Sequence, residues 1–206
     1  MRFAAVLSDL DGVLVDSGES VERVWREWAV AHGLDPDDVG RASHGVPGRQ
    51  VIERVAPWMD AAAESARVDE LHARTGGAAL PGAAELLASV SPLAVVTSCS
   101  PPLAAARFEA AGLTPPQVLV TSDVTERGKP YPDPYLFAAS ALGAEPSACL
   151  VIEDAPAGVA AARAAGMAVW AVTTTHAASE LFADVVAPDV RSLLPALRSR
   201  QPTAAG

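Results

Sequence analysis

The sequence predicts an α/β protein: a doubly wound parallel sheet with an all-helical subdomain inserted near the N-terminus. Two observations lead to this fold class. Six short apolar segments recur along the chain, and helix-like segments separate the later ones. The stretch from residue 16 to 80, in contrast, contains helical periodicity and no convincing strand. Alternating strands and helices are typical of a sheet with helices packed on both faces.

The six apolar segments are mostly rich in Val and Leu, and their apolar residues do not alternate with polar ones. This pattern is typical of parallel strands that are buried on both faces. We expect these strands at residues 3–7, 93–97, 117–121, 149–153, 168–172 and 183–187. Helices that begin near a proline and end at a glycine are expected at 101–112, 133–143 and 155–166. Together they predict a Rossmann-like core with crossover helices.

The helical insertion divides the chain into two predicted parts. We expect residues 16–80 to form a cap, and residues 1–15 and 81–206 to form the core. Because apolar residues recur there at helical spacing, three cap helices are expected. They lie around Val21–Trp28, at 48–56 and at 60–74.

Three of the four tryptophans lie in the predicted cap: Trp25, Trp28 and Trp58. Trp25 and Trp28 are at helical spacing from Val21 and Val24. We expect all three tryptophans to pack inside the helical bundle, since large apolar residues at such spacing usually form a core, and we retain the alternative that they stack on a ligand.

Composition excludes several classes of function. The formal net charge is −10, and no cluster of Lys or Arg interrupts it, so a nucleic acid would be repelled. No apolar run approaches the roughly 18 residues of a membrane span, and the N-terminal run is too short for a signal peptide. The two cysteines, Cys99 and Cys149, form neither a metal motif nor a disulfide framework. We therefore expect a monomeric, cytoplasmic protein that binds neither nucleic acid nor membranes.

Polar side chains follow four of the predicted strands, near the carboxyl end of each. They are Asp9 and Asp11 after the first strand, Thr97 and Ser98 after the second, Lys129 after the third, and Glu153 and Asp154 after the fourth. Each residue alone is as compatible with a turn, a helix cap or a solvated surface as with a site. Because parallel sheets bind ligands at this edge, we expect the set to converge. Carboxylates gathered in this way need a cation to balance them.

This set of residues suits the hydrolysis of phosphate esters. An aspartate nucleophile divides the reaction into two steps through an aspartyl-phosphate. Its attack on a phosphate dianion requires neutralisation of charge, which Mg²⁺ and a cationic side chain can provide. Asp9 and Asp154 can offer carboxylate oxygens to Mg²⁺, and Asp11 its backbone carbonyl. The sequence therefore favours a Mg²⁺-dependent phosphatase.

Four motifs carry a resemblance to a known family. The segments DLDGVLVDS, VVTS, GKPYPDPY and VIEDAPAGVAAARAAG resemble, in order and spacing, the motifs of the haloacid dehalogenase-like hydrolase superfamily. The resemblance extends over essentially the whole chain. The predicted cap is similar to that of the branch containing β-phosphoglucomutase, sugar phosphatases and glycerol phosphatases. The resemblance implies a Mg²⁺-dependent phosphatase of small phosphorylated sugars or polyols.

The resemblance also implies chemical roles for individual residues. Asp9 would be the nucleophile, and Asp11 would protonate the leaving alcohol and then activate water. Thr97 and Ser98 would hydrogen-bond the phosphoryl oxygens. Lys129, the only lysine in the chain, would lie between the phosphoryl group and Asp9. A compact ammonium fits between two oxygens as a point charge, where a guanidinium fork is too wide.

The same resemblance implies the metal ligands. Asp9, Asp154 and the carbonyl of Asp11 would hold Mg²⁺, and Glu153 would be either a ligand or a support for one. In the cap loop 42–50, His44 and Arg49 are expected to contact the substrate. For this pair we retain the alternative of a turn residue and a solvated helix residue.

Several alternatives remain at this stage. The cap contains no lysine, which disfavours phosphonatase chemistry, and Asp11 with Asp154 disfavours a dehalogenase. A phosphosugar mutase is less favoured, because related mutases carry a histidine near the first cap helix and residues 17–25 contain none. A scaffold that binds a phosphorylated ligand without turnover is the remaining alternative, and the presence of both Asp9 and Asp11 disfavours it.

Overall fold

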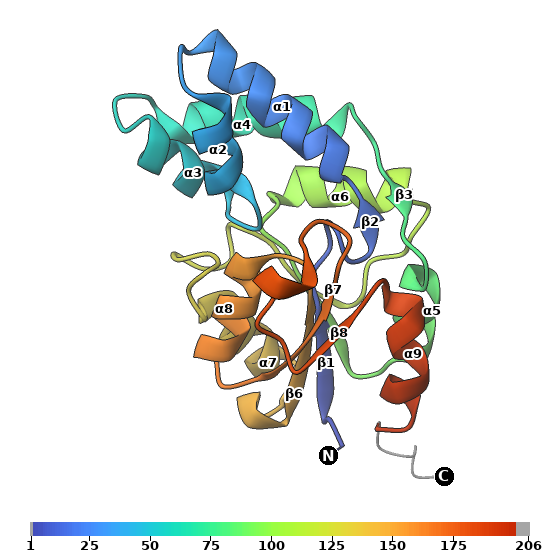
Figure 1. Cartoon of the computed structure of the whole chain (residues 1–206). Coiled ribbons are helices and arrows are strands. Elements are labelled where there is room, and N and C mark those ends of the chain that lie inside the picture. The colour runs from blue at the N-terminus through green and yellow to red at the C-terminus, as the bar shows by residue number, and fades with distance from the viewer. Residues whose placement is uncertain (1, 201–206) are drawn as a thin grey trace.

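A computed structural model describes residues 2–200 and contains a parallel sheet with helices on both faces and a helical segment at one end (Figure 1). The sheet has the order β5-β4-β1-β6-β7-β8, and every neighbouring pair is parallel. Its strands are β1 (Ala5–Ser8), β4 (Leu93–Val96), β5 (Val118–Val120), β6 (Cys149–Glu153), β7 (Ala168–Val172) and β8 (Val185–Ala187). The predicted fold class and all six predicted strands are confirmed.

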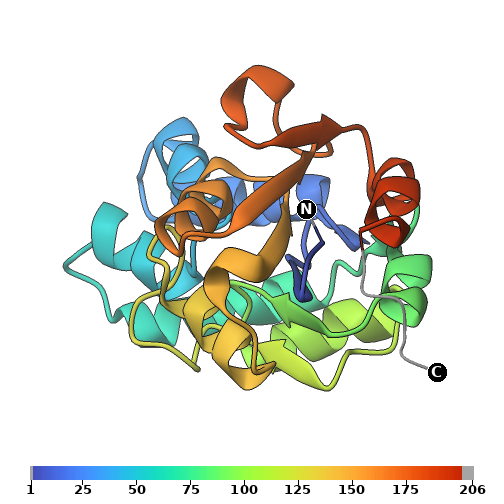
Figure 2. The same cartoon turned by 90° about the horizontal axis from the view of Figure 1, so that it is seen from below.

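Two groups of helices cover the two faces of the sheet, and the sheet lies between them when the molecule is viewed from below (Figure 2). One group consists of α5 (Ala83–Ser89), α6 (Pro101–Ala110) and α9 (Val190–Arg198). The other consists of α7 (Asp133–Ala141) and α8 (Pro156–Ala164). Two short 3-10 helices, η1 (Pro146–Ala148) and η2 (Ala178–Glu180), complete the core.

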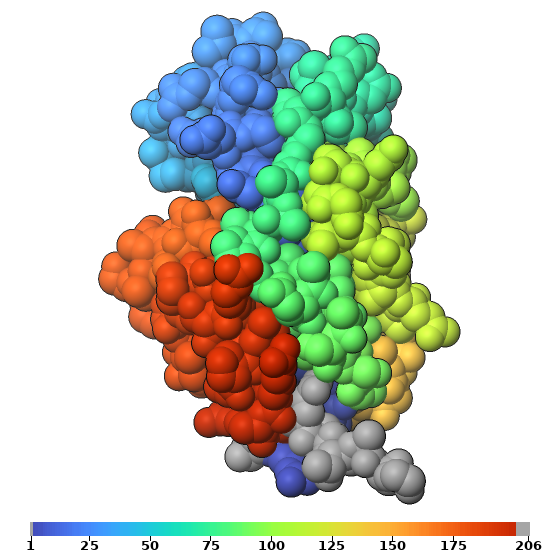
Figure 3. All heavy atoms as spheres, turned by 90° about the vertical axis from the view of Figure 1, so that its right-hand side faces the viewer, coloured from blue at the N-terminus to red at the C-terminus, as the bar shows by residue number. Residues whose placement is uncertain are grey.

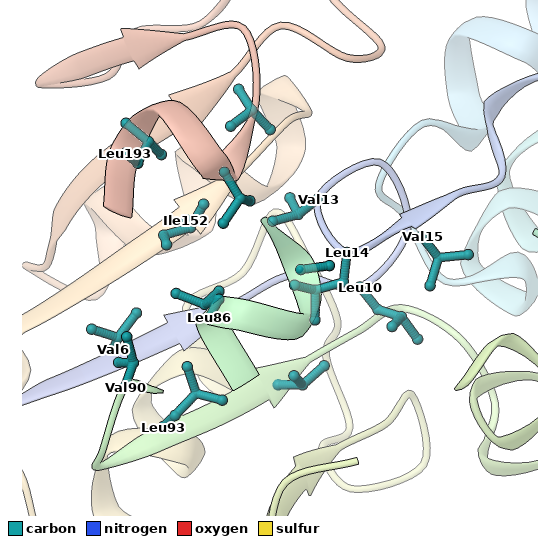
Figure 4. Close-up of a cluster of buried hydrophobic side chains, with 14 of the residues drawn as sticks. Val6, Leu10, Val13, Leu14, Val15, Leu86, Val90, Leu93, Ile152 and Leu193 are labelled. Carbon is teal, nitrogen blue, oxygen red and sulfur yellow. The ribbon is translucent and has the colours of Figure 1, made fainter. Parts of the chain in front are cut away.

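The cluster under α5 and α9 shows why this sequence forms a buried sheet. Val6 and Ile152 face Leu86 and Leu193 from adjacent strands, and all four are essentially inaccessible to solvent (Figure 4). Full burial of each such aliphatic side chain contributes about 1.5–3 kcal/mol to folding. Neighbouring strand residues such as Leu7 and Val151 face the opposite cluster, so both sheet faces are apolar. This two-sided burial explains the continuous apolar runs in the sequence.

The insertion begins and ends at a two-stranded antiparallel ribbon. The ribbon pairs β2 (Val15–Asp16) with β3 (Ala78–Ala79), and four helices lie between these strands: α1 (Gly18–Ala31), α2 (Pro36–Ser43), α3 (Gly48–Val55) and α4 (Ala61–Ala73). The expectation of no strand in this region is wrong, because two-residue strands are too short to produce a sequence pattern. The division of the chain at residues 16 and 80 stays a prediction.

Helix α2 was absent from the predicted cap helices, although its start has a recognisable signal. Pro36 is its first residue, and the carboxylate of Asp35 accepts a hydrogen bond of 2.9 Å from the backbone N–H of Asp37. An Asp cap followed by proline is a common helix start. Gly40 within the helix interrupts the expected helical pattern.

The interior of the cap contains two of the three cap tryptophans. Trp25 and Trp28 are buried with their rings edge to face, and their centroids are 5.6 Å apart. Trp58 lies in the turn between α3 and α4 and is 68% exposed, so the prediction that it packs inside the bundle is wrong. Because the turn at Pro57 and Trp58 lies outside both helices, helical spacing does not direct this side chain inward.

The cap lies directly on the core. Helix α4 of the cap packs against α6 of the core, and the space-filling view shows the two in contact beside the ribbon (Figure 3). Within residues 2–200, no helix combines the length and the apolar character needed to cross a membrane. The contact between α4 and α6 brings cap side chains close to the carboxyl edge of the sheet.

Candidate active site

The central strands of the sheet bring the predicted site residues to one edge. Strand β1 lies between β4 and β6, with Ser8 in register with Val95 and Ile152. Asp9 follows β1, and its backbone N–H donates to the carbonyl of Ile152 at 2.9 Å. Thr97 follows β4 in the same way. The order of strands, and not proximity in the sequence, therefore creates this site.

Lys129 is buried at the centre of the site, with only 1% of its surface exposed. Its ammonium lies 2.9 Å from Oδ1 of Asp9 and 2.7 Å from Oε1 of Glu153, and it donates to the carbonyl of Val96 at 3.0 Å. Burial by itself would lower the pKa of the amine, but the charges of Asp9 and Glu153 outweigh burial and hold the pKa above its usual value. Lys129 is therefore a fixed positive charge against Asp9.

Glu153 is completely buried, and both of its carboxylate oxygens already have partners. Oε1 accepts hydrogen bonds of 2.7 Å from both Lys129 and the hydroxyl of Tyr135. Oε2 accepts from the backbone N–H groups of Asp154 at 3.0 Å and Ala155 at 3.2 Å. A Cβ at position 158 would lie 1.6 Å from Oε1, so only glycine allows α8 to pass there. Glu153 thus orients Lys129 and the loop that carries Asp154.

Asp154 offers an oxygen that the protein leaves without a partner. Its Oδ2 accepts from the hydroxyl of Thr175, whereas Oδ1 is buried and has no hydrogen-bond partner among residues 2–200. Burial, followed by the charges of Glu153 and Asp9, raises the pKa of Asp154 well above its ordinary value. Burial also raises the pKa of Asp9 to about 7, even though Lys129 opposes this shift.

Oxygen atoms of Asp9, Glu153 and Asp154 lie within 4.8 Å of one another. Such a buried acidic cluster favours a cation, because a cation offsets both the loss of solvent and the mutual repulsion of the carboxylates. Oxygen-only ligands suit Mg²⁺, which usually takes one or two carboxylates and completes its shell with water and phosphate. The unpaired Oδ1 of Asp154 can serve as one of these carboxylate ligands.

Asp11 lies beside this cluster and is held by two groups that were absent from the predicted site. The thiol of Cys99 donates to Oδ2 at 2.8 Å, and Nε of Arg107 lies 3.0 Å from Oδ1. Arg107 comes from α6 and is 1% exposed. A sequence signal for it existed: Leu103, Arg107 and their neighbours share the inward face of the predicted helix at helical spacing.

The remaining core residues line a pocket that contains both Asp9 and Asp11. Thr97 and Ser98 lie in its wall. Oγ1 of Thr97 accepts from the backbone N–H of Cys99 at 3.1 Å. The hydroxyl of Ser98 donates to the carbonyl of Gly45 at 2.8 Å, and this bond joins the core to the cap loop.

The two predicted cap residues are placed differently. His44 lines the same pocket, with its ring 5.0 Å from the ring of His176. Burial, followed by the charge of His176, lowers the pKa of His44. Arg49 lies on α3, is largely exposed, and pairs with Glu53 at 2.8 Å. Arg49 lines a neighbouring groove instead of the pocket that contains Asp9. The structure therefore brings His44, and not Arg49, to the predicted site.

Known proteins are similar to this chain in fold and in sequence. The profile of the haloacid dehalogenase-like hydrolases matches residues 3–166. Hexitol phosphatase A of Escherichia coli (strain K12) is 46% identical over 184 residues, which are 84% of each chain. Validoxylamine A 7'-phosphate phosphatase of Streptomyces hygroscopicus subsp. limoneus is 39% identical over 91% of this chain and 94% of its own. The crystal structure of a hydrolase from Pseudomonas syringae matches with a TM-score of 0.82 and 27% identity, covering 96% of this chain and 99% of the other.

The chain therefore belongs to the haloacid dehalogenase-like hydrolases. The predictions of this superfamily and of a phosphatase within it are confirmed.

Proposed function

We propose that the chain is a Mg²⁺-dependent phosphatase that hydrolyses small phosphorylated polyols or sugars through a phosphorylated Asp9. The contact of 2.9 Å between Lys129 and Asp9, inside a buried acidic cluster, is the observation that carries this proposal. The names of the relatives support the substrate class, since they include a hexitol phosphatase and a glycerol-1-phosphate phosphohydrolase.

Three groups would hold the Mg²⁺: the carboxylates of Asp9 and Asp154 and the backbone carbonyl of Asp11. Glu153 would support this shell from behind, because its oxygens are already occupied by Lys129, Tyr135 and two backbone N–H groups. When bound, the ion supplies positive charge to the phosphoryl oxygens and to the acidic cluster.

In the first step, a carboxylate oxygen of Asp9 attacks the phosphorus while the bond from phosphorus to the ester oxygen breaks. Asp11 gives its proton to the departing alkoxide, which leaves as an alcohol. Lys129 holds Asp9 in place through the attack and balances its charge. Cys99 and Arg107 keep the Asp11 carboxyl pointed at the pocket.

In the second step, Asp11 is ionised and accepts a proton from water. The oxygen of that water bonds to phosphorus as the bond from phosphorus to Asp9 breaks, so inorganic phosphate leaves and Asp9 is restored. Thr97 and Ser98 line the pocket on the core side and would hydrogen-bond the phosphoryl oxygens through both steps, Ser98 by its backbone N–H because its hydroxyl donates to Gly45.

Charge in the pocket favours hydrolysis over a mutase reaction. A mutase of this family has to retain a bisphosphate, whose second phosphate needs a cation of its own. Among the described residues that line the pocket, Arg107 is the only Lys or Arg, and it already faces Asp11. Arg49 pairs with Glu53 outside the pocket.

A phosphate-release screen tests the proposal. Purified protein is assayed with hexitol 6-phosphates, glycerol phosphates, hexose 6-phosphates, phosphoglycolate and β-glucose 1-phosphate, with Mg²⁺ and with EDTA. We expect Mg²⁺-dependent release from polyol or sugar phosphates, and no formation of glucose 6-phosphate from β-glucose 1-phosphate. Formation of glucose 6-phosphate without phosphate release would support the mutase, and binding without turnover of any substrate would support a scaffold.

A further inference from the structure

The pocket that contains Asp9 and Asp11 extends toward the cap, beyond the groups that transfer phosphate. Its lining there includes Asp69 and His72 of α4, and Arg107 of α6. Asp69 and His72 are three residues apart in one helix and therefore share a face. His72 is 3% exposed and Arg107 is 1% exposed, which is unusual burial for such polar side chains.

Several buried polar atoms in this part of the pocket lack hydrogen bonds. Within residues 2–200, Nδ1 of His72 and Nη2 of Arg107 have no partner, and Nε of Arg107 and Oδ1 of Asp11 meet only as an ion pair. A buried polar atom without a partner costs about 1–3 kcal/mol, and native proteins leave few of them. Because both side chains line an open pocket, a ligand can provide the missing partners.

The charge balance indicates which ligand this is. Nε of Arg107 faces Asp11 at 3.0 Å, and the same guanidinium donates to the backbone carbonyl of Gly76. These contacts occupy one side of the guanidinium, so Nη2 is the donor that remains for a ligand. Burial, followed by the charge of Arg107, lowers the pKa of His72 to about 4, so its imidazole is neutral at pH 7. A neutral imidazole both donates and accepts hydrogen bonds, as a hydroxyl group does.

Asp69 is the third polar side chain in this part of the pocket, and its negative charge disfavours the binding of anions. Its carboxylate adds acceptors to the pocket wall beside Arg107, and a second anionic group of a ligand would be repelled there. The ring of Trp25, 6.3 Å from that of His72 between centroids, provides an apolar surface in the same wall. An apolar wall with a few placed polar groups is typical of a pocket for a small organic ligand.

We propose that Asp69, His72 and Arg107 form a hydroxyl-binding subsite for the leaving group of the substrate. The subsite selects monophosphates with a polyhydroxylated leaving group over bisphosphates and over esters without such hydroxyls. The inference rests on the proposed phosphatase function. It assigns substrate selection to residues at the contact between α4 and α6, and not to Arg49, the loop residue predicted from the sequence.

Two variants test the subsite: Asp69→Asn and His72→Phe. His72→Phe removes the hydrogen-bonding nitrogens of the imidazole, and Asp69→Asn replaces one acceptor oxygen with an amide donor at nearly the same volume. Each is assayed with sorbitol 6-phosphate and with p-nitrophenyl phosphate, whose leaving group has no further hydroxyl. We expect kcat/KM for sorbitol 6-phosphate to fall about 10–100-fold, because unpaired polar groups are left facing the substrate. For p-nitrophenyl phosphate we expect a change of less than about threefold, since that ester does not use these groups.

The control is Glu70→Gln. This residue follows Asp69 on the same helix, is exposed, and does not line this pocket, so kcat/KM should be unchanged with both substrates. Circular dichroism and thermal unfolding establish that the variants fold. Asp69 is only partly buried, so Asp69→Asn keeps the test decisive if His72→Phe does not fold.

Three results would overturn the subsite: equal losses with both substrates, no loss with sorbitol 6-phosphate, or wild-type turnover of glucose 1,6-bisphosphate as fast as of the monophosphate. Failure of the wild type to release phosphate from any ester is a different outcome. It would reject the proposed function itself.

Discussion

Lys129→Arg tests the geometry of the site most directly, because it keeps the charge and changes the shape. The ammonium of Lys129 has acceptors at 2.7, 2.9 and 3.0 Å, on Glu153, Asp9 and Val96. Only 1% of the side chain is exposed, so the site is closed to solvent on all sides of it. A planar guanidinium cannot place one nitrogen among these three acceptors without displacing Asp9 or Glu153.

The expected magnitude follows from that displacement. A shift of a reacting group by about 1 Å costs roughly 100-fold in rate. We therefore expect kcat to fall at least about 100-fold, which corresponds to about 2.7 kcal/mol of barrier. The free energy of unfolding should fall by about 1–3 kcal/mol, since the larger side chain overpacks the site. Lys129→Met should cost more, about 3–5 kcal/mol, because it leaves buried carboxylates without their cation.

Steady-state phosphate release at saturating substrate and Mg²⁺ measures the loss of kcat, and urea unfolding measures the loss of stability. Arg127→Lys is the matched control. It lies two residues earlier in the same loop, and its exposed guanidinium pairs with Asp133. Its kcat should stay close to that of the wild type. If Lys129→Arg retained wild-type kcat, the requirement for a compact cation would be refuted.

Four further changes probe the rest of the site. Asp9→Asn should reduce phosphate release to background while circular dichroism shows an intact fold, and substantial turnover would remove Asp9 as the nucleophile. Arg107→Lys should lower kcat about tenfold for alkyl phosphates, because the shorter reach of lysine misplaces Asp11. The loss should be smaller for p-nitrophenyl phosphate, whose phenolate leaving group needs little acid assistance. Equal losses with both esters would contradict the positioning role of Arg107. Mg²⁺ should raise the Tm of the wild type and do so less in Asp154→Asn, since a ligand that binds the folded state stabilises it. The folded pKa of His72 lies below its unfolded value, so its contribution of about 3 kcal/mol to the free energy of unfolding is present above pH 6.5 and is lost as pH falls toward about 4. In urea unfolding, His72→Phe should remove this part of the pH dependence of stability. An unchanged pH profile would contradict this expectation.

The strands and the converging motifs could be predicted because both depend on local sequence. Val6, Leu7 and their neighbours form an uninterrupted apolar run, and both sheet faces bury it. Asp9 and Asp154 directly follow two such runs, so the rule for ligand binding in parallel sheets placed them together. The roles of these residues, the monomeric state and the cellular location stay predictions.

The wrong or absent predictions about individual side chains share a different cause. Trp58 was expected inside the helical bundle, and no role was predicted for Arg107. The structure leaves Trp58 68% exposed and buries Arg107, which is 1% exposed. Whether a side chain is buried depends on which element packs over it, and that information comes from distant parts of the chain.

The sequence by itself determined the class of the protein, the order of the six sheet strands along the chain, and the set of acidic residues around Lys129. These features follow from hydrophobic periodicity and from motifs of a few residues, which need no partner elsewhere in the chain. Only the tertiary structure decided that Glu153 has no free oxygen, that Arg49 lies outside the pocket, and that Arg107 joins Asp11 to the cap. The first depends on Lys129 and Tyr135 reaching Glu153 from other segments of the core, and the last on the packing of α4 against α6, helices that are far apart in sequence.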